Sequence, residues 1–381
     1  MRVLRIDEHS PYQQLVGVGG IGTGIFFSLE GDHTLGREES RPGQLLDVRD
    51  YCKLHIVIHY IARLLGASQS GFPFHVMPIG NVGDDAPGHF VRKEMSDAGI
   101  DTGWVRTIPG KPTLFSVCFQ YPNGEGGNLT TSNSAAAALA GKDLNGVADL
   151  LASRGRRTIA LAAPEVPLEA RRRFLELATT AGAFRVASFV SAEILAMRDS
   201  GMLELLDLMS LNEGEAAELV GCQFAPEEPR PFIDACLKFL DTVYPNLQMV
   251  VTAGESGAYA FSGGVCNYCS APKVKVASTA GAGDSLLGAV LAARAAGIPL
   301  LRKGSRREKI TDGPLETALE FGVLLASPAR TEPGMEPFSG ADPRVHRLLA
   351  AVVEPEPSGE DRGRCLDAAR NRLWRNQNPG I

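Results

Sequence analysis

The chain has 381 residues, of which 44% are hydrophobic and 22% charged, as in an ordinary globular protein with one large domain or two smaller ones. Its net charge of −6 supplies no overall basic field, so neither nucleic acid nor an anionic membrane is expected as a partner. No apolar run is long enough to span a bilayer, no signal-peptide core is found, and seven scattered cysteines indicate reduced thiols; these features predict a cytoplasmic protein.

The first predicted element is a buried strand that runs into a glycine-rich stretch. The strand covers Gln14–Gly19, and Gly17–Gly22 formally matches the fingerprint of dinucleotide-binding proteins. That fingerprint requires a helix directly afterwards, whereas Thr23–Gly31 is β-prone and interrupted by glycine. We therefore expect a glycine-rich strand that crosses close to another backbone. A nicotinamide-dependent oxidoreductase is the weakest of three functional hypotheses.

Two excursions in the first third of the chain predict a small β lid. A β-hairpin with a polar tip is expected at about 26–43, and alternating residues at 112–121 predict a further strand before a turn. We place the lid segments roughly at 24–48 and 108–132. Between them we expect a helix over Asp50–Leu65, then a strand, a turn and a helix that ends near Ala98.

From about residue 135 onward, strands alternate with helices. This alternation predicts right-handed βαβ units, and hence an α/β fold with a doubly wound, mostly parallel sheet and helices on both faces. Ligands of such sheets bind beyond the carboxyl ends of the strands. Asn212, Thr252 and the loop after a strand ending at Val276 all lie at such ends, so we expect them to meet at one crevice. The predicted strands are 158–163, 185–190, 206–211 and 248–252; the helices are 168–181, 193–198, 231–244, 315–327 and one opened by 212–215.

The stretch Gly281-Ala282-Gly283-Asp284 precedes a predicted helix and carries the clearest chemical signal. Small residues let backbone N–H groups approach a ligand closely, and a helix N-terminus adds free donors and partial positive charge. Together they predict a phosphate-binding anion hole. A carboxylate at its rim, Asp284, could remove a proton from an attacking hydroxyl. The alternative is that Asp284 only caps the helix and the glycines only form a turn.

Two further segments at strand ends have the residue types of a nucleotide site. Asn212 and Glu215 lie one helical turn apart and could hold Mg²⁺ through water, or could form a helix capping box, and both can hold together. Thr252, with exposed amides at Gly254 and Gly257, could contact nucleotide phosphates or ribose, or could simply form a glycine turn between strands. A P-loop motif is absent, so phosphoryl transfer would depend on the anion hole, Mg²⁺ and an Asp base.

These motifs resemble those of the ribokinase-like (PfkB) carbohydrate kinases. The resemblance covers Val76–Glu125, where Gly80-Asn-Val-Gly-Asp-Asp85 and Gly99-Ile-Asp101 match in order, and Leu206–Leu291. It implies Asp284 as catalytic base and the amides of Gly281, Ala282 and Gly283 as anion hole. It also implies ATP and Mg²⁺ near Asn212 and Glu215, and a nucleotide bordered by Thr252, Gly254 and Gly257.

The substrate side of the chain departs from the family pattern. Gly24 stands near the place of the usual sugar-binding Asp, and Asp50-Tyr-Cys-Lys53 replaces a glycine- and asparagine-containing cluster. Val323 stands where an Asn is often found near the adenine, and Ser278 where the family usually has an Asp. A monovalent cation is therefore not predicted, and the substrate residues are unassigned. For Lys53 and Asp50 we favour a surface ion pair or a helix start over contact with an unusual acceptor.

We therefore predict an ATP-dependent kinase that phosphorylates a hydroxyl of a sugar or sugar-like small molecule. The alternative is a catalytically impaired nucleotide- or ligand-binding protein of the same fold. The kinase domain is expected to cover 1–340, followed by a Pro-, Glu- and Arg-rich C-terminal extension at 341–381. A homodimer through the lid is expected, because an uncovered sheet face would need burial.

Overall fold

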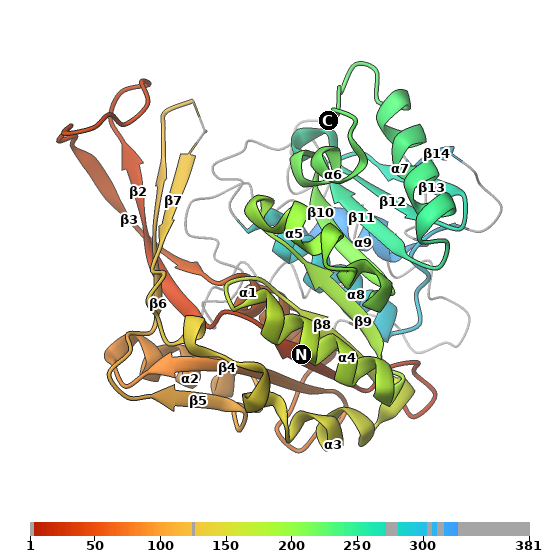
Figure 1. Ribbon diagram of the computed structural model, residues 1–381, viewed down its shortest axis with the longest axis horizontal. Helices are drawn as coiled ribbons and strands as arrows, with labels where there is room; N and C mark the ends of the chain where they lie inside the picture. The colour runs from red at the N-terminus through yellow and green to blue at the C-terminus, as the bar shows by residue number, and fades with distance from the viewer. Residues whose placement is uncertain (1–3, 124–125, 272–280, 303–306, 311–315, 327–381) are drawn as a thin grey trace, which may run out of the picture.

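The computed structural model describes residues 4–123, 126–271, 281–302, 307–310 and 316–326. Its strands form a ten-stranded sheet and a separate four-stranded sheet, and Figure 1 shows the smaller sheet projecting from one end of the larger one. The strand expected before Val276, the position of Ser278 and the extension at 341–381 lie outside the described residues.

The large sheet is mostly parallel, as predicted. Its β1, β4 and β8 to β11 are nearly continuous apolar runs, which is the pattern of strands buried on both faces. Only the pairs β11·β12 and β12·β13 are antiparallel. The strand order is β14 (Arg307–Ile310), β13 (Val265–Cys269), β12 (Ala258–Ser262), β11 (Gln248–Thr252), β10 (Leu208–Asn212), β9 (Phe184–Ser188), β8 (Thr158–Ala162), β1 (Gln14–Val18), β4 (His75–Gly83) and β5 (Val105–Ile108).

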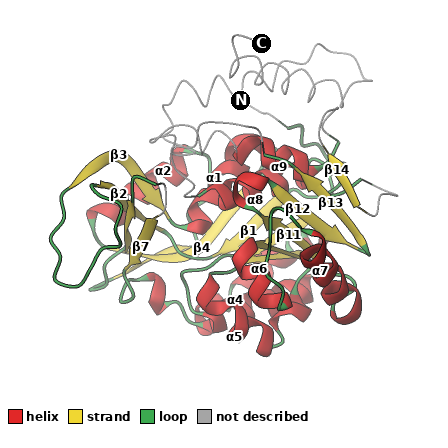
Figure 2. Cartoon of the chain, turned by 90° about the horizontal axis from the view of Figure 1, so that it is seen from above, coloured by secondary structure: helices red, strands yellow, loops and turns green. Residues whose placement is uncertain are grey.

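Helices cover both faces of this sheet, which confirms the doubly wound architecture (Figure 2). One apolar core lies under α1 (Lys53–Leu65), α2 (Ala86–Asp97), α8 (Ala282–Ala295) and α9 (Ala318–Ala326). The other lies under α3 (Val147–Ala152), α4 (Leu168–Ala181), α5 (Ile194–Asp199), α6 (Glu213–Val220) and α7 (Arg230–Val243). Short 3₁₀ helices connect these elements: η1 (Ala136–Ala138), η2 (Gly141–Leu144), η3 (Gly155–Arg157), η4 (Ser191–Glu193), η5 (Met202–Leu205) and η6 (Gly254–Ser256).

The four-stranded sheet, which we call the lid, has the order β3 (Gly43–Tyr51), β2 (Gly22–Leu29), β6 (Leu114–Gln120) and β7 (Gly126–Thr130). Its β2–β3 hairpin is longer than the one expected at 26–43. For the same reason the helix expected from Asp50 begins only at Lys53. The backbones of Asp50 and Tyr51 pair with Gly24 and Thr23 in the lid, and this pairing prevails over the helical pattern at that end.

The glycine-rich stretch Gly17–Gly22 leads into strand β2, so the helix that a dinucleotide site requires does not follow it. The expected close backbone crossing is confirmed at Gly22. A Cβ atom there would lie 2.1 Å from the carbonyl oxygen of Leu114 on the neighbouring strand. Only glycine allows this approach, so the motif has a packing explanation.

The position of α8 depends on tight packing against α1. A Cβ atom on Gly288 would lie 2.7 Å from Cβ of Tyr60 and 3.0 Å from the carbonyl oxygen of Val57. Because α8 begins at the predicted anion hole, this crossing also fixes where the hole lies.

We expect Gly288→Ala to lower the free energy of unfolding by about 1–2 kcal/mol, measured by urea denaturation. Overpacking costs about 1–3 kcal/mol, and the upper part of this range is expected here because the Val57 carbonyl oxygen belongs to the rigid backbone of a helix. Subtracting the gain of about 1 kcal/mol in helix propensity leaves about 1–2 kcal/mol. Gly141→Ala is the matched control, because its Cβ would make only ordinary contact with Arg173 at 3.6 Å. A Gly288→Ala protein as stable as the control would contradict the packing described.

Candidate active site

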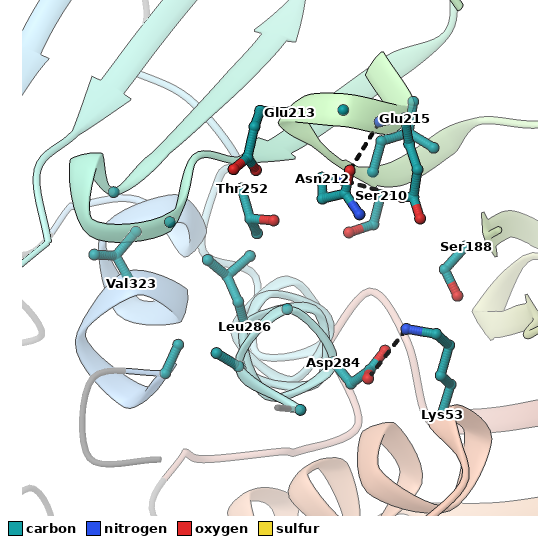
Figure 3. A pocket seen from close by; sticks show the side chains of 18 of the residues that line it. Lys53, Ser188, Ser210, Asn212, Glu213, Glu215, Thr252, Asp284, Leu286 and Val323 are labelled. Carbon is teal, nitrogen blue, oxygen red and sulfur yellow. Dashed lines mark hydrogen bonds and ion pairs between the residues drawn. The ribbon is translucent and has the colours of Figure 1, made fainter. Parts of the chain in front are cut away.

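The carboxyl ends of three neighbouring strands line one cavity of about 610 Å³. These strands, β9, β10 and β11, end at Ser188, Asn212 and Thr252, and all three residues face the cavity together with the start of α8 (Figure 3). The expected convergence at the carboxyl edge of the sheet is therefore confirmed.

Helix α8 begins without a side-chain cap. Its N-cap residue is Gly281, which adopts the left-handed conformation with φ of 70°, and Ala282, Gly283 and Asp284 are the first three helical residues. Their backbone N–H groups have no partner within the helix, and no side chain of the described residues caps them. All four residues line the cavity. The turn thus has the geometry of an anion site.

Asp284 is not the helix cap that we considered as an alternative. It is the third residue of α8, and its Oδ2 atom lies 3.5 Å from Nζ of Lys53 on α1. The Asp284 side chain is 11% exposed, so burial raises its pKa, and the Lys53 ammonium opposes that rise. Conversely, the Asp284 carboxylate raises the pKa of Lys53 to about 12. The Asp284 carboxyl group and the Lys53 ammonium therefore face one cavity together.

The expectation of a surface ion pair between Lys53 and Asp50 is wrong. Lys53 does start helix α1, but its partner is Asp284 inside the cavity. The hydroxyl of Ser116, on lid strand β6, instead donates a hydrogen bond to Asp50. Charge spacing along the chain could not reveal this, because the actual partners, Asp284 and Ser116, lie far along the chain from Lys53 and Asp50.

Glu165, which the sequence reasoning missed, lies beside the Lys53–Asp284 pair. Its Oε2 atom accepts a hydrogen bond of 3.2 Å from the backbone N–H of Lys53, and burial raises its pKa to about 7. Glu165 has a φ of 71°, an uncommon conformation for a residue other than glycine. A Cβ atom on Gly20 would lie 2.6 Å from Glu165 Oε2, so the glycine makes room for the carboxyl group.

Asn212 and Glu215 form the capping box that was one of the two expectations for them. Asn212 Oδ1 accepts from the Glu215 N–H at 2.8 Å, and Glu215 Oε2 accepts from the Asn212 N–H at 2.9 Å. Both residues line the cavity. Burial raises the pKa of Glu215, while the Asn212 N–H and Lys53 lower it, so Glu215 belongs to the same electrostatic cluster.

The cavity is also lined by Thr252, Gly254 and Gly257, each in a different local setting. The hydroxyl oxygen of Thr252 lies 3.8 Å from the position that a Cβ atom on Gly283 would take, next to the predicted anion hole. Gly254 starts the 3₁₀ helix η6 with φ of 52°. At Gly257, φ is 107° and a Cβ would lie 2.1 Å from the Cys269 carbonyl oxygen, so backbone packing alone requires glycine there.

The other end of the cavity is apolar. Leu286 of α8 and Val323 of α9 lie away from Lys53 (Figure 3), and Ala326 of α9 also lines the cavity. Such a wall suits a flat, weakly polar group, whereas the end with Lys53 and Asp284 suits charged atoms. The cavity thus has an apolar part and an ionic part.

The comparisons with known proteins agree with this geometry. The sequence model of the pfkB family carbohydrate kinases matches residues 57–339, and the chain belongs to this family. The fold is similar to that of ribokinase from Cryptococcus neoformans var. grubii serotype A in complex with ADP, at 20% identity over 85% of this chain and 96% of that chain, with a TM-score of 0.61. Arabidopsis thaliana ribokinase complexed with ribose and ATP is also similar, at 20% identity, 89% and 99% coverage, and a TM-score of 0.61.

A third similar structure is a protein from E. coli described as a ribokinase II, in complex with ATP and Mg²⁺. It shares 19% identity over 84% of this chain and 94% of that chain, with a TM-score of 0.62. These neighbours establish the ribokinase-like fold. Within the described ranges, no helix has both the length and the apolar character needed to cross a bilayer.

Proposed function

We propose that this protein transfers the γ-phosphate of ATP to a hydroxyl of a sugar or sugar-like small molecule. The observation that carries the proposal is the position of Asp284. A buried carboxylate, held by Lys53, lies directly after three amides that form an uncapped helix N-terminus in a cavity. A base and an anion hole at one point are what phosphoryl transfer to an alcohol requires.

The proposal gives each group of the cavity a role. Asp284 accepts the proton of the acceptor hydroxyl as that oxygen attacks the γ-phosphorus. The N–H groups of Gly281, Ala282 and Gly283 donate to the phosphate oxygens on which charge develops. The Lys53 ammonium lowers the pKa of Asp284, which favours its ionised form, and lies where it can neutralise transferred phosphate. The adenine fits the apolar end at Leu286, and Thr252, Gly254 and Gly257 border the phosphates and ribose.

Glu215 fits a role toward Mg²⁺. Its Oε2 atom is committed to the capping box, whereas Oε1 makes no hydrogen bond to the described residues and is free to accept from a hydrated cation. Oxygen ligands and retained water suit Mg²⁺, which when bound would neutralise phosphate charge. The monovalent cation remains unassigned, because Ser278 lies outside the described residues.

We expect Glu215→Gln to raise the Mg²⁺ concentration for half-maximal activity about tenfold, with little change in melting temperature. The amide oxygen of Gln still accepts from the Asn212 N–H, so the cap survives while the charge is lost. Activity measured against Mg²⁺ concentration tests this. Glu218→Gln, an exposed change on the same helix, is the control. An unchanged Mg²⁺ requirement would remove Glu215 from the metal site.

The proposed function is tested by incubating the protein with ATP, Mg²⁺ and a panel of sugars, polyols and nucleosides. ADP formation and the mass of the phosphorylated product are measured. Acceptor-dependent product supports the kinase. Tight ATP binding without transfer to any acceptor would favour the catalytically impaired binding protein instead.

We also propose that the kinase domain ends near residue 340 and that 341–381 is a separate extension.

We further propose that the lid pairs with the lid of a second copy of the chain. Its edge strands β3 and β7 carry Leu45 and Leu129, which are 62% and 68% exposed. Leu45→Lys combined with Leu129→Lys should shift a dimer to a monomer in sedimentation velocity. A wild-type monomer would contradict the pairing.

A further inference from the structure

Asp50 is held in a fixed position beside the candidate active site. It lies opposite Gly24 in the β2–β3 ladder, and its Oδ2 atom accepts a hydrogen bond from the Ser116 hydroxyl on β6. Its own carbonyl oxygen accepts a hydrogen bond of 3.2 Å from Thr23 Oγ1. Three strands of the lid therefore position this one carboxylate.

Gly24 is needed for this arrangement. A Cβ atom on Gly24 would lie 2.3 Å from Ser116 Oγ and 2.4 Å from the Ser116 carbonyl oxygen. Any side chain at position 24 would displace the hydroxyl that holds Asp50. Burial raises the pKa of the Cys118 thiol on β6, and the charge of Asp50 and a hydrogen bond to it add to this rise. Because a carboxylate offers about four lone-pair sites, Asp50 can accept a further hydrogen bond from a ligand.

Asp50 belongs to a group of three neighbouring carboxyl groups. Its charge contributes to the raised pKa values of Glu165 and Asp284, so the three groups are close neighbours. Lys53 lowers the pKa of Asp284 and Glu165, and Glu165 also opposes the effect of burial on the pKa of Arg171. The Lys53 ammonium pairs with Asp284, and Arg171 pairs with Glu193 at 2.7 Å. Within the described ranges, neither Asp50 nor Glu165 forms an ion pair of its own with a Lys or Arg side chain.

We propose that Asp50 determines acceptor specificity, so that the site takes polyhydroxylated molecules without negative charge, amine-bearing ones best, and rejects phosphorylated or carboxylated ones. This inference rests on the proposed kinase function. A carboxylate accepts hydrogen bonds from hydroxyl and ammonium groups but repels an anion, and like charges placed together cost several kcal/mol. Because Lys53 pairs with Asp284 and Arg171 with Glu193, no unpaired cation of the described cluster is left to receive a second phosphate.

The test is equilibrium binding with matched ligand sets in the presence of Mg²⁺ and a non-hydrolysable ATP analogue. Glucose, glucosamine and glucose 6-phosphate form one set, and myo-inositol, an inosamine and myo-inositol 1-phosphate form another. For at least one set, the amino and neutral members should bind at least about tenfold more tightly than the phosphate. A site that binds the phosphates best, or binds no member of either set, would overturn the proposal.

Two variants assign the selectivity to Asp50. Asp50→Asn should weaken the amino member relative to the neutral one about tenfold and reduce the discrimination against phosphate. Ser116→Ala keeps the charge but removes its hydrogen bond, so affinity should fall while discrimination against phosphate persists. If Asp50→Asn does not fold, Ser116→Ala still tests the role of Asp50. Asp149→Asn, an exposed change on α3, is the control.

Unchanged selectivity in folded Asp50→Asn, or loss of discrimination in Ser116→Ala, would overturn the assignment. Binding is measured without transfer, so the two proposals can fail separately. If the protein discriminates between ligands by charge but phosphorylates none of them, the kinase proposal is refuted and the proposed role of Asp50 stands. Turnover confined to phosphorylated acceptors would refute the role of Asp50 and leave the kinase.

Discussion

Asp284→Asn is expected to lower kcat by about 10²–10⁴-fold, the usual contribution of a positioned general base. Asparagine has the same shape and can occupy the third position of α8, but it cannot accept the hydroxyl proton. ATP binding should persist or tighten, because the anion-hole amides remain and a negative charge near the phosphates is removed. Steady-state ADP formation and calorimetric titration with ATP measure the two effects.

Asp149→Asn is a matched control for this change. Asp149 is also the third residue of its helix, α3, but it is exposed and does not line the cavity. Its substitution should leave kcat unchanged. If Asp284→Asn retained more than about a tenth of wild-type kcat while remaining folded, Asp284 would not be the base.

Lys53→Met is expected to reduce kcat/KM by at least about 10²-fold and to move the pH dependence of the reaction. The loss of an electrostatic donor to developing charge typically costs about 10²–10³-fold. Burial raises the pKa of Asp284 and Lys53 lowers it, so removing Lys53 raises that pKa. A base works only above its pKa, and the acidic limb of the pH–rate profile should therefore shift to higher pH.

Lys53→Arg separates charge from shape. Arginine keeps the positive charge, so the acidic limb should return toward its wild-type position even if kcat/KM is only partly restored. Lys93→Met is the control, because Lys93 forms an exposed ion pair with Asp97 within α2 and should have no effect on the reaction. An acidic limb that stays in place in Lys53→Met would show that Lys53 does not govern the protonation of Asp284.

Much of the fold could be predicted from the sequence because its signals are local. Buried parallel strands are short apolar runs, and the expected helix 168–181 coincides with α4. Likewise, Asn212 and Glu215 meet through a hydrogen-bond pattern that spans one turn. The expected start of α1 was wrong because pairing within the lid holds Asp50 in a strand, and pairing between segments is not visible in local periodicity.

The sequence by itself determined the glycine-rich turn before α8, the acid that follows it, and the alternation that brings strand ends to one edge. Each depends on residues within a few positions of one another. Only the tertiary structure decided that Lys53 pairs with Asp284, that Glu165 lies beside them, and that Asp50 is held by Ser116. These contacts join different helices, strands and loops, and the distances between those elements are set by packing such as that of Gly288 against α1. Ionic partners on different elements produce no periodic pattern in the sequence, so local patterns cannot predict them.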